Sequence, residues 1–154
     1  AFIVNRFSPL LNGRCHLTNR DGSPFSPKAI GELGERIACQ WLRAHGGKVL
    51  YRNFRAPRGG EVDIVAREGD VLLFTEVKTR TSETFARPLF AVNAKKQKLI
   101  RRGAHAWLKL LDRRDFLWRF DVLEIILLDG HPPKINRVEH AFESKPTERR
   151  RPSV

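Results

Sequence analysis

The sequence predicts an α/β fold in which helices pack against a mixed central sheet. Two segments carry apolar residues at the spacing of three and four that is typical of a helix with one buried face. Five shorter segments have the composition of strands, and the elements follow one another in the order αβββαββ. With 154 residues, the chain has room for one such domain and not for two.

The first predicted helix begins after Ser26, which can cap it with Pro27 in the first turn. Gly46 and Gly47 are suited to end it. Its apolar stripe, which a helix needs for packing on a core, consists of Ile30, Gly34, Ile37 and Trp41.

Three strands are expected next, over residues 49–54, 61–67 and 71–80. A second helix is expected over residues 94–111, with Asn93 as its cap. Its apolar stripe consists of Ile100, Ala104, Trp107, Leu108 and Leu111. Two further strands, over residues 118–128 and 135–141, complete the predicted sheet.

Both ends of the chain have the composition of tails. Residues 1–27 contain the turn signals Asn12-Gly13 and Asp21-Gly22, and we expect them to lie outside the core. Residues 144–154 are basic and nearly devoid of apolar side chains, as in a solvated tail. The predicted domain therefore spans residues 28–143.

The charge of the chain favours a polyanionic partner. Lys and Arg number 29 against 17 Asp and Glu, which gives a net charge of +12 and makes DNA the first expectation. An adaptor role towards an acidic protein or a membrane surface rests on net charge alone. No apolar run is long enough to cross a membrane, and we expect no membrane partner. The two cysteines and five histidines lack metal-ligand spacing, so a reducing cytoplasm is the expected location.

The most informative segment is the pair of strands around Gly69-Asp70. If these two residues form a hairpin loop, Asp63 lies opposite Glu76, with Cβ atoms roughly 5 Å apart. Side chains alternate along a strand, so Lys78 shares the face of Glu76. A shift of one residue in the register would separate the three side chains.

Two carboxylates this close repel by about 3 kcal/mol at an effective dielectric constant of 20, and they need a cation. Mg²⁺ (or Mn²⁺) meets that need, because it binds one or two carboxylates together with water and phosphate. With Lys78 beside it, such a site can hydrolyse a phosphodiester. The alternative is a solvated network of ion pairs, which is the commoner fate of charges on a sheet. The apolar residues around both carboxylates speak against that alternative.

The two helices offer further site residues. Glu35 lies at the border of the apolar face of the first helix and can reach the sheet, although an ordinary surface position is the simpler interpretation. Gln97 falls inside the sheet-facing arc of the second helix, where a polar group needs a reason.

Basic residues surround this predicted site. The second helix carries a basic stripe suited to phosphate contacts, made of Lys95, Lys98, Arg102, His105 and Lys109. Arg55 and Arg58 precede Asp63 in the chain, and Arg80 follows Lys78. We expect these three arginines to border the site and contact nucleic acid.

Taken together, the motifs resemble the PD-(D/E)XK nuclease superfamily, in which an Asp, a Glu-x-Lys tripeptide and often a helical Glu surround Mg²⁺. Across residues 28–143 the sequence looks more closely like the YraN-type family, which is bacterial and similar in pattern to archaeal Holliday-junction resolvases. The segments that carry this resemblance are Gly34-Glu35, Asn53-Phe54-Arg55, Gly60-Glu61-Val62-Asp63, Glu76-Val77-Lys78-Thr79-Arg80, Lys96-Gln97, Arg119-Phe120-Asp121-Val122 and Ala141-Phe142.

The resemblance implies a restriction-endonuclease-like core with metal ligands Asp63, Glu76 and Glu35. It further implies that Lys78 assists the attacking water and that Gln97 points to the active site. Asp121 matches a recurrent position to which we assign no role, and the simplest alternative there is a structural hydrogen bond. The resulting hypothesis is a metal-dependent DNA endonuclease acting on branched or structured DNA. The alternative is a non-catalytic nucleic-acid-binding module on the same fold, and the sequence leaves a homodimer open.

Overall fold

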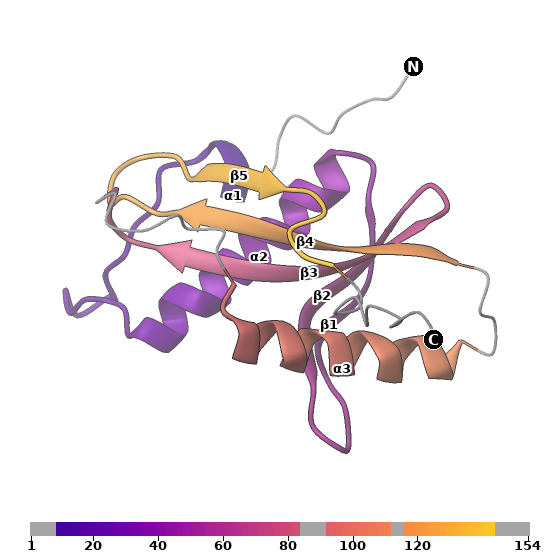
Figure 1. The fold of residues 1–154 in the computed structure, drawn as a ribbon. Coiled ribbons are helices and arrows are strands. Elements are labelled where there is room, and N and C mark those ends of the chain that lie inside the picture. The colour runs from indigo at the N-terminus through magenta and orange to yellow at the C-terminus, as the bar shows by residue number, and fades with distance from the viewer. Residues whose placement is uncertain (1–8, 84–91, 112–115, 144–154) are drawn as a thin grey trace, which may run out of the picture.

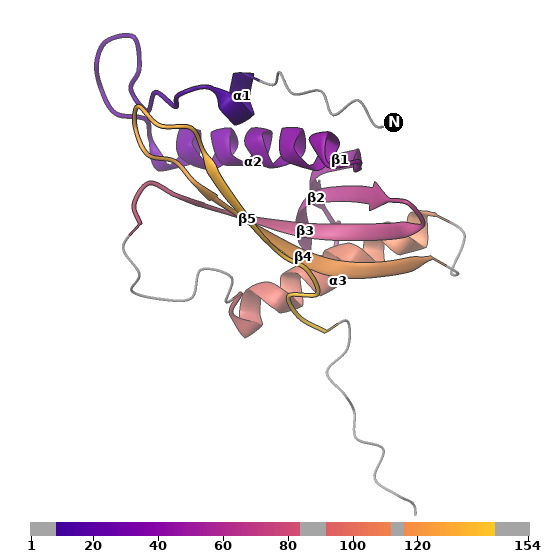
Figure 2. The same ribbon diagram turned by 90° about the horizontal axis from the view of Figure 1, so that it is seen from above.

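The computed structural model describes residues 9–83, 92–111 and 116–143. They form a five-stranded sheet in the order β1-β2-β3-β4-β5, with the long helix α2 on one face and α3 on the other (Figures 1 and 2). The expected α/β architecture with a mixed sheet between helices is confirmed, and it is consistent with a restriction-endonuclease-like core.

The first three strands form a continuous antiparallel meander made of β1 (Lys48–Arg55), β2 (Glu61–Glu68) and β3 (Val71–Arg80). Strand β4 (Leu117–Ile126) runs parallel to β3, and β5 (Lys134–Val138) is antiparallel to β4. Parallel neighbours need a crossover connection, and α3 lies in the segment that joins β3 to β4.

Helix α2 (Pro27–Ala44) begins where the sequence predicts. The Ser26 hydroxyl accepts the backbone N–H of Ala29, which satisfies one of the free donors of the first turn. The helix meets β3 at Gly34, where a Cβ atom would overlap the Thr79 side chain. A residue without a side chain is therefore what lets the helix approach the sheet closely.

Helix α3 (Ala94–Leu110) is capped by the Asn93 side chain, which accepts the backbone N–H of Lys96. Gly103 faces the backbone of β2, because a Cβ there would lie 2.9 Å from the main-chain atoms of Glu61. This contact brings α3 against the start of β2.

Each face of the sheet buries its own apolar cluster. The cluster under α2 includes Ile37, Leu42, Leu73 and Leu123, and the cluster under α3 includes Phe74, Ile100 and Phe120. Burial on both faces explains why β2, β3 and β4 are nearly continuous apolar runs.

The segment before α2 differs from expectation. The sequence placed residues 1–27 outside the core, but a short helix α1 (Pro9–Asn12) precedes Cys15, which is buried in the α2-side cluster. The Cys15 N–H donates to the His131 carbonyl oxygen at 2.8 Å, and the Leu17 N–H donates to Asp129 Oδ1 at 2.9 Å. The turn signals are real, but the apolar residues between them cover α2.

The other domain boundaries stay predictions. The expected basic tail, residues 144–154, lies outside the described residues. Strand β5 ends at Val138, three residues before the expected end, because the chain turns there and Ala141 donates its N–H to the Phe120 carbonyl oxygen. No helix in the described part of the chain is long and apolar enough to cross a membrane.

Candidate functional site

The β2–β3 hairpin has the register that the sequence predicts. Ile64 pairs with Thr75 and Glu68 with Val71, around the two-residue turn Gly69-Asp70. The ladder ends at this Ile64–Thr75 pair, and Asp63 and Glu76 are the next residues beyond it. There, Asp63 Oδ2 accepts the backbone N–H of Val77 at 2.8 Å. The Asp63 carboxylate is thereby held against the backbone of β3, between Glu76 and Lys78.

Glu76 is a buried carboxylate with incomplete pairing. Only 3% of its surface is exposed, and Lys78 Nζ lies 3.0 Å from Oε1. Lys96 Nζ lies 3.4 Å from Oε2, yet Oε2 has no hydrogen-bond partner in the described part of the chain. Burial, and then the charge of Asp63, raise the pKa of Glu76 to about 7 in spite of the two lysines. Glu76 therefore keeps one buried oxygen without a hydrogen bond among the described residues, and its carboxyl group holds a proton to a higher pH than an exposed glutamate does.

Lys96 joins this site from the first turn of α3. It forms a hydrogen bond to Glu61, whose other oxygen accepts from Arg55 Nη1 at 2.7 Å. Burial lowers the pKa of Lys96, but Glu61, Glu76 and Asp63 outweigh it and raise that pKa. Arg55, expected to contact nucleic acid, is thus also the ion-pair partner of Glu61.

Glu35 approaches the same region from α2. Its Oε2 accepts from Asn53 Nδ2 at 3.0 Å, and burial followed by the charge of Asp63 raises the Glu35 pKa. Asn53 has a φ of 52°, a left-handed conformation that Asn tolerates better than most residues. Within the described residues, no three acidic, His or Cys side chains converge tightly enough to hold a metal ion. Glu35 as a third ligand therefore stays a prediction.

Gln97 is half-buried on α3, as its position in the sheet-facing arc suggests. Its amide donates to the Val92 carbonyl oxygen at 2.8 Å and accepts from Arg101 at 3.1 Å. Among the described residues, none of its hydrogen bonds goes to Asp63 or Glu76. Its expected role at the site also stays a prediction.

The predicted basic stripe is exposed along α3. It comprises Lys95, Lys98, Arg102, His105 and Lys109. Arg58 is exposed in the loop between β1 and β2, next to Gly59, and a Cβ on Gly59 would lie 3.9 Å from the Arg102 guanidinium. The β1–β2 loop therefore adjoins the basic stripe at Arg102.

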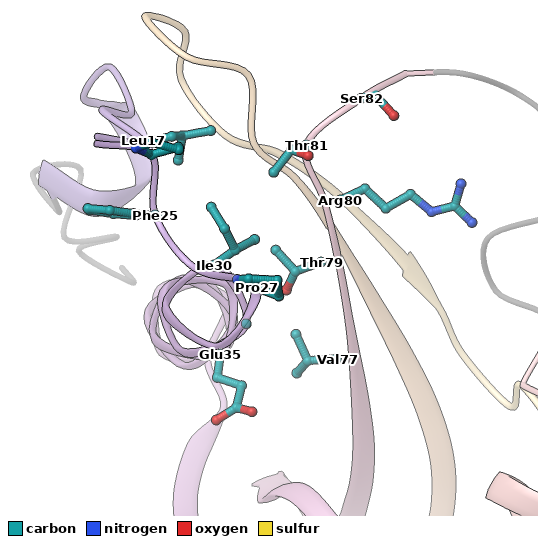
Figure 3. Close-up of a pocket in the computed structure, with 12 residues that line it drawn as sticks. Leu17, Phe25, Pro27, Ile30, Glu35, Val77, Thr79, Arg80, Thr81 and Ser82 are labelled. Carbon is teal, nitrogen blue, oxygen red and sulfur yellow. The ribbon is translucent and has the colours of Figure 1, made fainter. Parts of the chain in front are cut away.

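A cavity of about 700 Å³ opens on the α2 side of the site. It lies between the first turns of α2 and the end of β3, with Glu35 and Val77 at one end and Leu17 and Thr81 toward the other (Figure 3). Arg80, expected at the border of the site, is among its lining residues. The described structure therefore offers a hollow next to Glu35.

Comparison with known proteins assigns the chain to a protein family. The sequence pattern of the uncharacterised protein family UPF0102 matches residues 34–125, which include Glu35, Asp63, Glu76 and Lys78. A UPF0102 protein of Geobacter metallireducens is 45% identical, over 75% of this chain and 93% of its own length. One from Alkaliphilus metalliredigens is 39% identical, over 75% of this chain and 98% of its own length. The chain belongs to the UPF0102 family. This is the YraN-type family of the PD-(D/E)XK-like superfamily, so the resemblance seen in the sequence is confirmed.

The chemistry of the UPF0102 site fits the divalent cation that the superfamily implies. Glu76 Oε2 is a buried oxygen without a hydrogen-bond partner in the described part of the chain. Asp63 supplies a second carboxylate close enough to raise the pKa of Glu76. Mg²⁺ takes hard oxygen ligands and needs only one or two carboxylates when water and phosphate complete its shell. Asp63 and Glu76 are the residues that would hold it.

Asp121, to which the sequence assigned no role, is held in a network of hydrogen bonds in this UPF0102 chain. It is 1% exposed and accepts from Arg119 Nε at 2.9 Å and from Arg137 Nη2 at 2.8 Å. Arg137 also donates to Glu68 and lies over the Trp41 ring. This network joins β4, β5, the β2–β3 hairpin and α2 on the face opposite Glu76.

The sequence assigned no role to three participants, Glu61, Lys96 and Asn53, although each lies in a segment that carries the family resemblance. Lys96 precedes Ile100 by one helical turn and so lies on the buried face of α3, which was the available signal. Glu61 faces Arg55 across the β1–β2 ladder. Asn53 lies in the Asn53-Phe54-Arg55 segment of the resemblance, but its role depends on the contact between α2 and β1.

Proposed function

We propose that this protein is a metal-dependent endonuclease that hydrolyses phosphodiesters in DNA, with Asp63, Glu76 and Lys78 at the reacting centre. The observation that carries the proposal is the buried Glu76 carboxylate, which faces Asp63 and leaves one oxygen without a hydrogen bond among the described residues. A buried charge of this kind is costly unless a cation binds it.

The side chains have separate tasks in this reaction. The Val77 N–H holds the Asp63 carboxylate in place, so Asp63 needs little rearrangement to act as a ligand. Bound Mg²⁺ would supply charge neutralisation at the phosphate and acidify a water molecule. The Lys78 ammonium lies 3.0 Å from Glu76. In this proposal it orients that water and stabilises the charge that develops on the phosphoryl oxygens.

The substrate is proposed to be branched or otherwise structured DNA. The exposed cations of the α3 stripe are suited to contact phosphates, which every DNA sequence presents, so the proposal ties substrate choice to the shape of the DNA and not to its sequence. Two copies related by a twofold axis would present two reacting centres to a branched substrate, and sedimentation velocity of the protein with and without DNA tests that dimer.

A non-catalytic DNA-binding module is the second candidate, and one observation favours it. Lys78 and Lys96 both pair with Glu76, so the site is partly neutralised without a metal ion. In that case the basic stripe would bind DNA and no bond would be broken.

A cleavage panel decides between the two candidates. Single-stranded, duplex, flap and four-way-junction DNA are incubated with Mg²⁺, Mn²⁺ or EDTA. We expect cleavage of branched DNA with either cation and none with EDTA. Asp63→Asn, Glu76→Gln and Lys78→Ala each lower the cleavage rate about a hundredfold or more, while DNA affinity changes little.

The matched control is Asp70→Asn, in the turn of the same hairpin, where the side chain is 97% exposed. This variant keeps the wild-type cleavage rate. Mn²⁺ binding is measured separately by titration calorimetry, and Glu76→Gln abolishes it. Metal-responsive cleavage that survives all three site substitutions contradicts the proposal, and DNA binding without cleavage of any substrate favours the binding module.

A further inference from the structure

A second buried carboxylate, Glu124, lies on β4 within the apolar run of residues 122–127. It is 2% exposed, and its Oε2 accepts from Asn136 Nδ2 on β5 at 3.2 Å. Its Oε1 has no hydrogen-bond partner among the described residues. An acidic side chain in such a run costs free energy, and a leucine or isoleucine would avoid that cost. Glu124 therefore needs an explanation that packing does not give.

The sheet registers place Glu124 next to Lys78. The parallel ladder pairs Lys78 of β3 with Glu124 of β4, and the antiparallel ladder pairs Glu124 with Asn136 of β5. The three side chains thus form a row across three strands on one face of the sheet. Neighbouring strands lie about 4.8 Å apart, so the long Lys78 side chain can bring its ammonium group to the Glu124 carboxylate.

Lys78 consequently stands between two buried carboxylates. Glu76 precedes it by two residues on the same face of β3, and Glu124 adjoins it across the ladder. The Lys78 ammonium contacts Glu76 in the metal-free site, while its side chain is 36% exposed. The Lys78 ammonium has three N–H donors, so it can donate to Glu124 as well as to Glu76 without a change in the backbone.

We propose that Glu124 is a positioning residue for Lys78: it receives the Lys78 ammonium when a divalent cation takes Glu76. The inference rests on the proposed function for its catalytic meaning. Asn136 holds one oxygen of Glu124 from the far side of the row, which leaves the other for Lys78. Without Glu124, a lysine released from Glu76 would turn into solvent and leave its position at the phosphate.

The first test needs neither metal nor activity. In Glu76→Gln without divalent cations, Lys78 no longer has a charged partner on β3, and we expect its ammonium to bond to Glu124. Proton-detected NMR of the lysine Nζ groups shows this as a slowly exchanging Lys78 ammonium with a coupling to the Glu124 carboxyl carbon. The signal disappears in the double variant Glu76→Gln/Glu124→Gln. A Lys78 ammonium that exchanges like a surface lysine in Glu76→Gln overturns the proposal.

The second test uses cleavage kinetics of the full chain with Mg²⁺. Since misplacing a reacting group slightly is costly, we expect Glu124→Gln to lower kcat by about ten- to a hundredfold, with KM and the Mn²⁺ dissociation constant within about twofold of wild type. Glu124→Asp, which keeps the carboxylate, recovers part of the loss. An unchanged kcat in Glu124→Gln overturns the proposal.

The matched control is Asp121→Asn, a buried carboxylate on the opposite face of the same strand. It lowers the melting temperature and leaves kcat of the folded protein unchanged. If Glu124→Gln instead behaves like this control, Glu124 is only structural. If wild-type protein cleaves no DNA, the proposed function fails, and the NMR test still decides the pairing of Lys78 with Glu124.

Discussion

At the scale of single residues, Glu76 shows how the apolar surroundings of a strand set the chemistry of an acid. Its neighbours Phe74 and Thr75 are fully buried, and Asp63 adds a negative charge close enough to raise its pKa. Two lysines offset only part of this penalty, so the carboxyl keeps its proton to a higher pH than an exposed glutamate does.

The pH dependence of stability follows from that environment. In the presence of EDTA, Glu76 is protonated in the folded chain up to about pH 7, whereas in the unfolded chain it ionises near 4.5. The folded state therefore binds more protons between these values, and rising pH destabilises it. Relative to Glu76→Gln, wild type should lose up to about 3 kcal/mol of unfolding free energy between pH 4.5 and pH 7.5. Urea denaturation of both proteins across this pH range measures this loss of unfolding free energy. Stability profiles of wild type and Glu76→Gln that run parallel with pH would contradict the prediction.

Sequence reasoning predicted the register of the β2–β3 hairpin, and the structure confirms that register. The roles of the site residues stay predictions. Asp63, Glu76 and Lys78 come from one hairpin, and its turn residues fix their register. No role was assigned to Lys96 or Glu124 from the sequence. Lys96 lies on the buried face of its helix, and the neighbours of Glu124 depend on a parallel pairing that sequence alone does not align.

At the scale of elements, the approach of α2 to β3 depends on one glycine. A Cβ at Gly34 would overlap Thr79, so Gly34→Ala must push the helix away from the sheet, and Glu35 with it. We expect a loss of about 1–3 kcal/mol of unfolding free energy, as in other overpacked cores. Thr79→Ala in the same chain should restore most of it. Thermal denaturation of the single and double variants measures both effects.

Gly31 provides the control within the same helix. Nothing lies within 4 Å of a Cβ there, so Gly31→Ala should stabilise the protein by up to about 1 kcal/mol through helix propensity. Equal effects of the two substitutions would show that propensity, and not the contact with Thr79, determines the result.

The basic surface of α3 can be tested as a unit. We expect replacement of its four cations by Gln to weaken DNA binding and to lower the log–log salt slope by roughly 0.9 for each phosphate that is no longer neutralised. The residues are Lys95, Lys98, Arg102 and Lys109. Fluorescence anisotropy of duplex and junction DNA at several salt concentrations measures the slope. An unchanged slope would exclude this helix from the DNA interface.

At the scale of the whole molecule, the sequence predicted the order of the main elements and the mixed sheet. It did not predict that the segment before α2 packs on the core. Its turn dipeptides are typical of a tail, and its partners, Asp129 and His131, lie more than a hundred residues further along the chain. Local patterns carry no information on such a contact.

That contact makes a prediction about local stability. Asp129→Ala removes the acceptor of the Leu17 N–H, and we expect a loss of about 1 kcal/mol, the usual net value of one hydrogen bond. Native-state hydrogen exchange should accelerate at Cys15 and Leu17 and remain unchanged in β2 and β3. Faster exchange throughout the sheet would indicate that this segment is not a separate unit of stability.

The crossover between β3 and β4 also bears on the order of folding. Strands β1 to β3 are joined by short turns, and so are β4 and β5, so each group can pair through contacts that are local in sequence. Joining β3 to β4 closes a much longer loop, which slows that step. Asp63 and Glu76 meet within the first group, whereas Lys78 acquires Glu124 as a neighbour only at the last joining. In a newly synthesised chain, Asp63 and Glu76 would therefore come together before Lys78 lies beside both Glu76 and Glu124.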